Sequence, residues 1–315
     1  MPNDWEEQLN GLKQGSVRSL ARLITWVENR RTGWMDAMKT IYRNNGQTRV
    51  IGITGSPGAG KSTLTGKLTS TLVEKGYSVG VIAVDPSSPF TGGALLGDRL
   101  RMKAISTMEG VFVRSMATRG ALGGLSLAAR DAVKIMDAFG KDIVIIETVG
   151  VGQDEVEVVR TADLVIVVCV PGQGDGIQAI KAGIMEIADF FVVNKADRDG
   201  ADQVVMDIQT MLSLSSQDND IKIPVLKTVS TTGQGIPELV ETMSDFLTDT
   251  EKTPKKTENR IREELLVLLE KETARALRKN WVDKGLLDKA VGNIISGESD
   301  PYSIVQEAIK TSLIN

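Results

Sequence analysis

Short runs of β-branched and apolar residues recur through the middle of the chain, separated by stretches with helical periodicity. A run of four to eight such residues between turn residues is typical of a buried strand. Strands that alternate with helices indicate a mostly parallel, doubly wound sheet with helices on both faces, and ligands bind at the carboxyl ends of its strands. We therefore predict an α/β fold with strands at 50–54, 79–84, 111–113, 143–146, 164–170, 190–193 and 225–229.

The N-terminal part of the chain has a different pattern, in which apolar residues recur at helical spacing. The first stripe comprises Leu20, Leu23, Ile24 and Val27, and the second comprises Trp34, Met38 and Ile41. Apolar side chains three and four residues apart share one face of a helix. We interpret both stripes as packing faces of a helical segment over residues 1–45, which precedes a nucleotide-binding domain at 46–250.

The C-terminal part of the chain also reads as helical. Residues 250–258, TEKTPKKTE, are charged and contain a proline, which predicts a linker. Residues 261–281 then predict a long helix whose stripe either packs on the preceding domain or pairs with another subunit. The stripe comprises Leu265, Leu268, Leu269, Ala276 and Leu277. We expect residues 251–315 to form a helical dimerisation extension.

Residues 55–62, GSPGAGKS, spell a complete phosphate-binding loop between the strand at 50–54 and a helix predicted at 63–75. Glycines let successive backbone N–H groups turn inward around phosphates, and the following helix N-terminus favours an anion. Lys61 is expected to reach the β- and γ-phosphates, and the Ser62 hydroxyl to bind Mg²⁺. The predicted nucleotide contacts are Gly55, Ser56, Pro57, Gly58, Ala59, Gly60, Lys61, Ser62 and Thr63.

Residues 194–197, Asn-Lys-Ala-Asp, follow the strand at 190–193 and indicate guanine. The Asp197 carboxylate can accept two N–H bonds from the guanine edge, a donor pattern that adenine lacks. Asn194 is expected to bond the opposite edge of the base, and the stem of Lys195 to cover its plane. Ser230 and Thr231, after the strand at 225–229, would add backbone contacts to the base, although an ordinary turn explains them equally well.

Three carboxylates, Asp85, Asp98 and Glu147, stand where Mg²⁺ chemistry would need them. Asp85 and Glu147 each end a predicted strand, and Asp98 lies in a loop-to-helix segment. Mg²⁺ prefers an octahedron of oxygens from hydroxyl, phosphate, water and one or two carboxylates. For Asp98 a role as a surface charge or helix cap stays open.

The segment after Glu147 bears on hydrolysis. The Gly150 N–H is placed to detect a γ-phosphate, as in other nucleotide hydrolases. Ras-like GTPases have a water-orienting glutamine next, whereas this chain has Val151. We therefore expect slow intrinsic hydrolysis that depends on a partner or on rearranged switches. The glycine-rich segment 170–181 is either such a two-state loop or a plain strand–helix connection.

Composition bears on the partners of the protein and on the kinds of catalysis open to it. The 315 residues carry a net charge of −4, with acidic and basic residues interspersed, and no apolar run approaches the ~20 residues of a membrane span. We expect no nucleic-acid partner, no membrane partner and a cytoplasmic protein without a signal peptide. The chain has no histidine and one cysteine, Cys169 in a predicted strand. This excludes imidazole catalysis and disfavours a redox centre or a metal-insertion GTPase.

Several long strings resemble the MeaB/ArgK family of GTPases, which includes the human methylmalonic aciduria type A protein. They are GSPGAGKST, VIAVDPSSPFTGGALLGDRLRM, IIETVGVGQDEVEV, PGQGDGIQAIKAGIMEIAD and NKAD, with LARLITWVEN near the N-terminus. The resemblance implies a P-loop NTPase fold that binds GTP or GDP with Mg²⁺.

The resemblance also implies a partner and further site residues. Family members act as chaperones of an adenosylcobalamin-dependent acyl-CoA mutase of the methylmalonyl-CoA mutase type, gate its cofactor delivery and form homodimers through the C-terminal helices. Ser62, Asp85, Asp98 and Glu147 match the family's metal positions, Arg101 lies near the nucleotide, and Lys181 belongs to a switch loop at 170–181. Two alternatives stay open: a nucleotide-dependent kinase or ATPase linked to amino-acid transport, and a metal-insertion GTPase.

Overall fold

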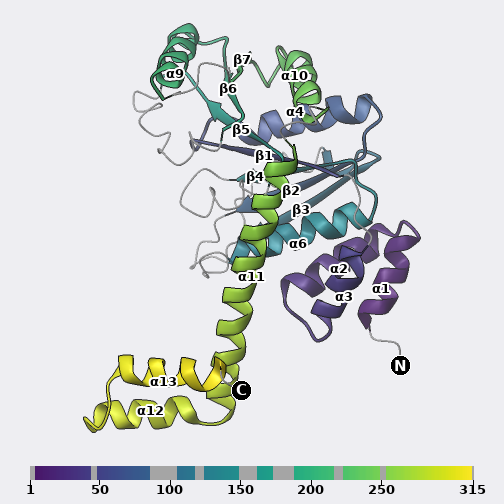
Figure 1. Ribbon diagram of the computed structural model, residues 1–315. Helices are drawn as coiled ribbons and strands as arrows, with labels where there is room; N and C mark the ends of the chain where they lie inside the picture. The colour runs from purple at the N-terminus through teal and green to yellow at the C-terminus, as the bar shows by residue number, and fades with distance from the viewer. Residues whose placement is uncertain are drawn as a thin grey trace. The chain divides into compact units, whose positions relative to one another are not determined.

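The computed structural model describes residues 4–43, 48–85, 105–117, 124–148, 162–172, 188–215, 223–248 and 253–313. The chain divides into two compact units, Met1–Arg260 and Ile261–Asn315. The first unit holds the predicted α/β sheet, and the second is helical (Figure 1).

Seven strands form one sheet in the order β3-β2-β4-β1-β5-β6-β7, and all neighbouring strands run parallel. Each of the seven predicted runs is a strand, which confirms the α/β fold. Because the central strands β1, β4, β5 and β6 are buried on both faces, their sequences are almost continuously apolar rather than alternating. The strands are β1 (Arg49–Gly55), β2 (Val79–Asp85), β3 (Val111–Ala117), β4 (Ile143–Thr148), β5 (Leu164–Cys169), β6 (Phe190–Asn194) and β7 (Val225–Thr228).

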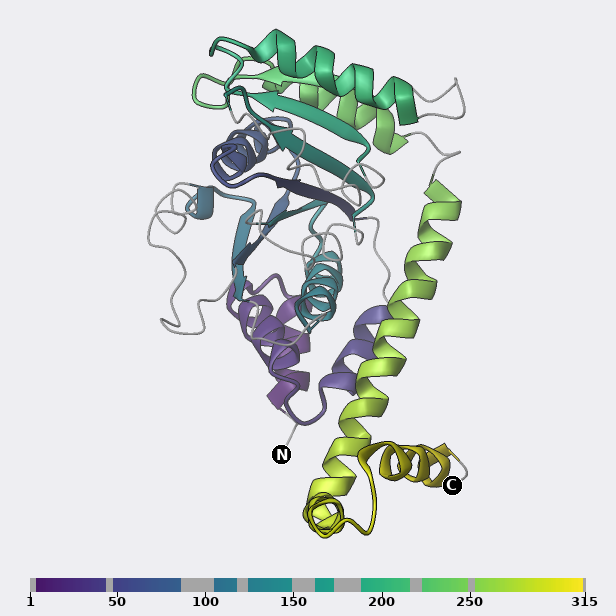
Figure 2. The same ribbon diagram turned by 90° about the vertical axis from the view of Figure 1, so that its left-hand side faces the viewer.

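Helices cover both faces of the sheet (Figure 2). On one face, α4 (Lys61–Glu74) and α10 (Ile236–Thr248) pack against alternate residues of the strands, among them Ile51 and Ile53 of β1. The opposite face is covered by α6 (Gly124–Ala138) and α9 (Ala201–Ser215). The arrangement leaves the carboxyl ends of the strands as the edge where loops can gather around a ligand.

The N-terminal helices α1 (Asp4–Lys13), α2 (Val17–Glu28) and α3 (Trp34–Tyr42) share a core with α6. The predicted stripe at Leu20, Leu23, Ile24 and Val27 is at most 1% exposed, which confirms it as a packing face. Two ion pairs join these helices to the sheet layers, Arg30 with Asp131 at 2.6 Å and Arg114 with Glu28 at 2.5 Å. A separate N-terminal segment ending at residue 45 stays a prediction.

Aspartates stand directly before three strands, β4, β5 and β6, and hold the amino edge of the sheet. Asp142, before β4, accepts the Ser78 backbone N–H at 2.7 Å and the Ser78 hydroxyl at 2.6 Å. Asp163, before β5, accepts the Val50 N–H at 2.8 Å. Asp189, before β6, accepts the Val165 N–H at 3.0 Å. Each carboxylate thus fixes the start of the neighbouring strand, where the ladder would otherwise leave a donor unpaired.

The second unit is built from α11 (Thr253–Asp283), which begins before the unit boundary, with α12 (Leu286–Ile295) and α13 (Pro301–Leu313). The predicted linker at 250–258 is wrong from Thr253 onward, because α11 already begins there. Pro254 falls in the first helical turn, where its missing N–H costs nothing, and the lysines that follow are good helix formers. In the described part of this unit only one hydrophobic residue, Ala308, is buried.

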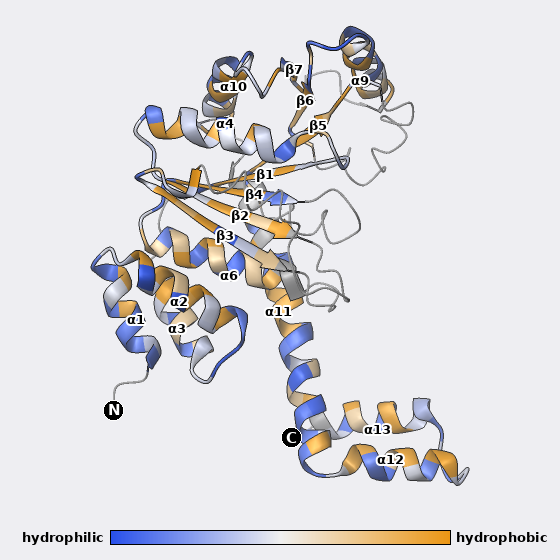
Figure 3. Ribbon diagram, turned by 180° about the vertical axis from the view of Figure 1, so that it is seen from behind, coloured by the Kyte–Doolittle hydropathy of each residue, from blue (hydrophilic) through white to orange (hydrophobic). Residues whose placement is uncertain are grey.

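The unit therefore exposes much of its apolar surface, and Figure 3 shows hydrophobic residues along α12 and α13. Leu265 and Leu269 of the predicted stripe are each 55% exposed. No helix in the described parts of the chain combines the length and the apolar character needed to cross a bilayer.

Candidate nucleotide site

The phosphate-binding loop lies at the carboxyl end of β1, the strand between β4 and β5. Two of its glycines, Gly55 and Gly60, have backbone angles and close neighbours that a side chain would not allow. Gly55 has φ +140°, and a Cβ there would lie 2.2 Å from the carbonyl oxygen of Val168 on β5. Gly60 has φ +88°, and a Cβ there would lie 2.5 Å from Nδ2 of Asn194. The loop can therefore pack against β5 and the predicted guanine motif only if both positions lack a side chain.

Lys61 is the first residue of α4 and only 5% exposed. Its Nζ donates to the carbonyl oxygens of Gly55 at 2.7 Å and Ser56 at 3.0 Å. The ammonium thus lies inside the curl of the loop, where positive charge from the lysine and the helix N-terminus coincide. This is the geometry expected of a group that neutralises phosphate oxygens.

Ser62 and Glu147 meet across two elements. The Ser62 hydroxyl on α4 donates to Glu147 Oε1 at 2.5 Å, and Glu147 on β4 is 6% exposed. Glu147 stands opposite Ile53 of β1 and Ala83 of β2 in the ladder, so the sheet fixes its position beside the loop. A hydroxyl and a carboxylate held together are the donor pair that a Mg²⁺ ion beside phosphates uses.

The other two predicted metal ligands are less defined. Asp85 ends β2, next to β4, but its side chain lies outside the described residues, as does all of Asp98. Within the described ranges, no group of three or more acidic or cysteine side chains converges. The four-residue metal set therefore stays a prediction, of which the structure brings Ser62 and Glu147 together.

Asn194 is the centre of a hydrogen-bond network and is 1% exposed. Its Nδ2 donates to the Ala59 carbonyl in the phosphate loop at 2.8 Å. Its Oδ1 accepts from the Thr228 hydroxyl at 3.2 Å, the Ser230 N–H at 3.2 Å and the Ser230 hydroxyl at 2.7 Å. Asn194 therefore joins β6, the end of β7 and the phosphate loop, and the second Nδ2 hydrogen is the one available to a base.

Lys195 makes a second connection to the loop. It has φ +56°, an uncommon backbone for a residue with a side chain, and its Nζ donates to the Gly58 carbonyl at 2.7 Å. The turn is closed by the Ala196 N–H on the Thr228 carbonyl at 3.0 Å. The phosphate loop and the predicted guanine motif are thus hydrogen-bonded to each other, and Asp197 is exposed beside them.

Thr228 was not predicted from the sequence, and Ser230 was predicted to contact the base rather than Asn194. Ser230 is 3% exposed and bonds Asn194, whereas Thr231 is exposed. The observation that identifies Thr228 is its position, because it pairs with Asn194 in the parallel ladder of β6 and β7. Direct contacts of Ser230 and Thr231 with a base stay predictions.

Several predicted functional residues lie outside the described residues. They are Arg101, Gly150, Lys181 and, within the segment 170–181, everything after Gly172. Cys169 is described, and burial raises the pKa of its thiol to about 12. A thiol this far from ionisation belongs to the core of the sheet, as the sequence indicated.

Comparison with known proteins identifies the family of the chain. The family model described as methylmalonyl Co-A mutase-associated GTPase MeaB matches residues 20–284. A protein of Pyrococcus horikoshii named as a GTPase is 48% identical over 304 residues, which cover 95% of each chain. GTPase ArgK of Escherichia coli is 44% identical over 207 residues, which cover 64% of this chain and 62% of that one.

Two further relatives carry other descriptions. The mitochondrial methylmalonic aciduria type A homolog of Mus musculus is 35% identical over 254 residues, covering 75% of this chain and 61% of its own. The crystal structure of a LAO/AO transport system kinase aligns over 99% of both chains with a TM-score of 0.70 and 28% identity. With a phosphate loop, a guanine motif and a family match over most of its length, the chain belongs to the MeaB family of P-loop GTPases and hydrolyses GTP.

Proposed function

We propose that this GTPase serves an adenosylcobalamin-dependent acyl-CoA mutase of the methylmalonyl-CoA mutase type, gating delivery of the cofactor and protecting the enzyme. The observation that carries the proposal is the match of residues 20–284 to a family described by its association with that mutase. The mouse relative, named for methylmalonic aciduria, supports the same client.

The nucleotide would act through the phosphate loop and its metal. Lys61 neutralises phosphate oxygens, and Ser62 with Glu147 would hold Mg²⁺, which polarises the phosphates during hydrolysis. The short hydrogen bond from Ser62 to Glu147 supports this pairing, because it brings the hydroxyl and the carboxylate together beside the loop. Asp85 and Asp98 would complete the oxygen set directly or through water, and Asp197 would select guanine.

Hydrolysis is proposed to be slow until the mutase binds. Val151 cannot orient water, so the transition state would need contacts supplied by the segment 170–181 and Arg101 once the partner rearranges them. In other GTPases a single added arginine accelerates hydrolysis by about 10³–10⁵. Gln178 and Lys181 are the side chains of this segment with which such a response can be tested.

The test is single-turnover GTP hydrolysis with and without purified methylmalonyl-CoA mutase. Lys181→Ala and Gln178→Ala should reduce the stimulation by the mutase more than the basal rate. Lys67→Ala, on an exposed position of α4, is the matched control and should change neither. Unstimulated wild-type hydrolysis, or equal fractional losses with and without mutase, would contradict this proposal.

We also propose a homodimer formed through the second unit. This unit buries almost no apolar side chain in its described part, while Leu265, Leu269 and Tyr302 are 55%, 55% and 87% exposed. A cavity of about 860 Å³, lined among others by Leu277, Trp281 and Ile304, lies between its helices. A small helical unit without a core of its own is stabilised when a second copy covers such surface.

Light scattering tests the dimer. Leu265→Asp with Leu269→Asp should convert the full-length protein into a monomer, whereas Leu214→Asp should not. Leu214 is an equally apolar residue, 84% exposed on α9 in the first unit. A monomeric wild-type chain would refute the proposal.

The two alternatives predict different chemistry. A kinase linked to transport would transfer phosphate from ATP to a protein, and one structural relative is described as such a kinase. The Asn-Lys-Ala-Asp motif favours guanine instead, so competition between GDP and ADP for the site discriminates. A metal-insertion GTPase would bind a transition metal, and a chain without histidine and with one buried cysteine is poorly suited to that.

A further inference from the structure

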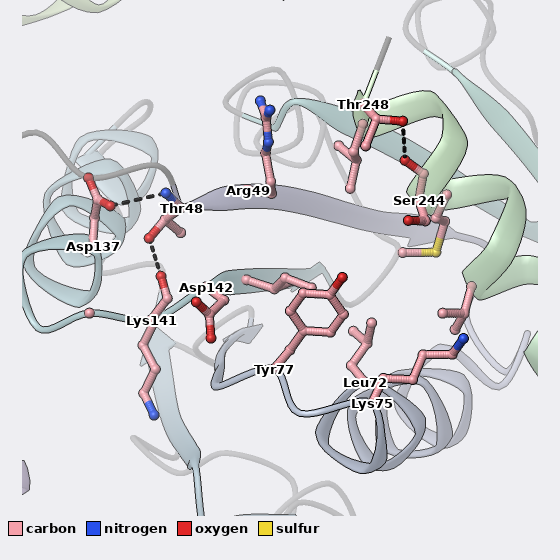
Figure 4. A pocket seen from close by; sticks show the side chains of 15 residues that line it. Thr48, Arg49, Leu72, Lys75, Tyr77, Asp137, Lys141, Asp142, Ser244 and Thr248 are labelled. Atoms are coloured by element: carbon pink, nitrogen blue, oxygen red, sulfur yellow. Dashed lines mark hydrogen bonds between the residues drawn. The ribbon is translucent and has the colours of Figure 1, made fainter.

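Polar side chains are used differently at the two edges of the sheet. At the amino edge, around a cavity of about 700 Å³, Asp137 accepts the Thr48 backbone N–H at 3.2 Å and the Thr48 hydroxyl donates to the Lys141 carbonyl (Figure 4). These bonds join the start of β1 to the end of α6 and the turn after it. At the carboxyl edge, the Thr228 hydroxyl instead donates to the side chain of Asn194, which we predict to contact the base. A group that bonds a ligand-binding side chain can control how that side chain meets its ligand.

Thr228 is held firmly in its place. It ends β7, stands opposite Asn194 of β6 in the parallel ladder, and is 0% exposed. Its backbone carbonyl accepts the Ala196 N–H at 3.0 Å, and its hydroxyl lies 3.2 Å from Asn194 Oδ1. A threonine is stiff about χ1 because its Cβ is branched. The strand therefore aims this hydroxyl at one point, the oxygen of the Asn194 amide.

The two ends of the Asn194 amide face opposite kinds of group. Oδ1 accepts from the Thr228 hydroxyl, the Ser230 N–H and the Ser230 hydroxyl, and Nδ2 donates to the Ala59 carbonyl. If the amide were turned over, its NH₂ group would face the Ser230 N–H, which can only donate. Its oxygen would then face the Ala59 carbonyl, which can only accept. The network thus favours one orientation of the amide, and the two hydroxyls limit the swing of a side-chain torsion that is broad in asparagine.

This orientation decides what a bound base meets. One Nδ2 hydrogen bonds Ala59, and the second is left for the base edge opposite the one predicted for Asp197. Guanine presents two acceptors on that edge, N7 and O6, whereas adenine presents N7 beside a 6-amino donor. An N–H donor held toward this edge matches guanine and meets a second donor in adenine.

We propose that Thr228 and Ser230 are positioning residues for guanine, whose hydroxyls hold Asn194 Oδ1 away from the base so that the base always meets an N–H donor. They add selection at the N7/O6 edge to the selection by Asp197 at the other edge. This role rests on the predicted contact between Asn194 and the base, and it is independent of the proposed mutase.

Calorimetric titration of the full-length protein in Mg²⁺, without a mutase, tests this role with GDP and three analogues. In 7-deaza-GDP the N7 acceptor is replaced by C–H, in 6-thio-GDP the O6 acceptor is replaced by a weaker one, and IDP lacks the 2-amino group that Asp197 would bind. The wild type should prefer GDP to 7-deaza-GDP or to 6-thio-GDP by about fivefold, the scale of one hydrogen bond.

Thr228→Val keeps the shape of the side chain and removes its hydroxyl. GDP should then bind about threefold to fivefold more weakly, while the analogue that lacks the relevant acceptor is weakened less, so the preference narrows. The preference over IDP should stay the same, because the Asp197 edge is not altered. Ser230→Ala removes the other hydroxyl on the same oxygen and should narrow the same preference, whereas Thr228→Ser keeps a hydroxyl and should restore it.

Thr69→Val is the matched control. It removes a threonine hydroxyl from α4 that is also 0% exposed but has no hydrogen-bond partner among the described residues, so all four affinities should be unchanged. If Thr228→Val or Ser230→Ala weakened GDP and its analogues by one common factor, the hydroxyls would support the site only structurally and the proposal would be overturned. Equal wild-type affinity for GDP, 7-deaza-GDP and 6-thio-GDP would also overturn it, because Asn194 would then not read this edge.

Discussion

The Asn194 network predicts that a residue of the guanine motif stabilises the fold itself. Asn194→Ala removes four hydrogen bonds at a 1% exposed position, to Ala59, Thr228 and twice to Ser230. At a net value of about 1 kcal/mol for each bond, the loss of unfolding free energy is about 4 kcal/mol. Ser230→Ala removes only the bond from its hydroxyl, which predicts a loss of about 1 kcal/mol.

Urea unfolding without nucleotide, followed by circular dichroism, measures both losses. Amide hydrogen exchange at Ser230 adds a local reading, because its N–H loses its acceptor only in Asn194→Ala. Thr231→Ala changes the exposed neighbouring residue and is the control. GDP affinity is measured on the same samples, so that weakened binding can be separated from a weakened fold.

One clear result would refute this stabilising role of Asn194. If Asn194→Ala unfolds at the wild-type urea concentration and keeps slow exchange at Ser230, the network contributes nothing to stability. A loss of GDP affinity in such a stable variant would mean that Asn194 acts on the base alone. A loss in Ser230→Ala as large as that in Asn194→Ala would show that the bonds do not contribute separately.

Three further predictions concern single carboxylates. The hydrogen bond from the Ser78 hydroxyl holds the pKa of Asp142 below its ordinary 3.8, so the Asp142 carboxylate stabilises the fold above that pH and loses this effect as the pH falls through the lowered pKa. The Tm difference between the wild type and Asp142→Ala should therefore shrink in acid, and a constant difference would refute this. Glu147→Ala should abolish most Mg²⁺-dependent GTP hydrolysis while nucleotide binding is partly kept, and wild-type turnover would contradict the metal role. Asp197→Asn should weaken GTP binding by roughly 1–3 kcal/mol and favour xanthosine triphosphate. A titration that gives the wild-type GTP affinity would show that Asp197 does not read the base.

The elements that sequence predicted best are those whose pattern follows from burial alone. The central strands β1, β4, β5 and β6 could be predicted because both of their faces are covered. The phosphate loop could be predicted because Gly55 and Gly60 have positive φ angles and leave no room for a Cβ. The start of α11 was missed because a proline in charged sequence suits a linker and a first helical turn equally.

The bonds within the site were harder to predict. Thr228 and Ser230 contact Asn194 only because β7 lies beside β6, and the order of strands is a property of the whole sheet. The same holds for Asp142, Asp163 and Asp189, whose position before a strand is visible in the sequence but whose acceptor role depends on the neighbouring strand. Local pattern gives the elements, and the tertiary arrangement decides which side chains meet.

The central place of β1 has a consequence for synthesis of the protein. Arg49 pairs with Ile143, 94 residues later, and Ile51 with Leu164, 113 residues later, so the strand that carries the phosphate loop has no partner when it leaves the ribosome. The Asn194 network closes only when Ser230 emerges, 175 residues after Gly55. At about 5–20 residues per second, this interval lasts roughly 9–35 s. During translation the nucleotide site is thus among the last features of the first unit to form, and β1 must be kept from wrong pairings until β4 and β5 emerge.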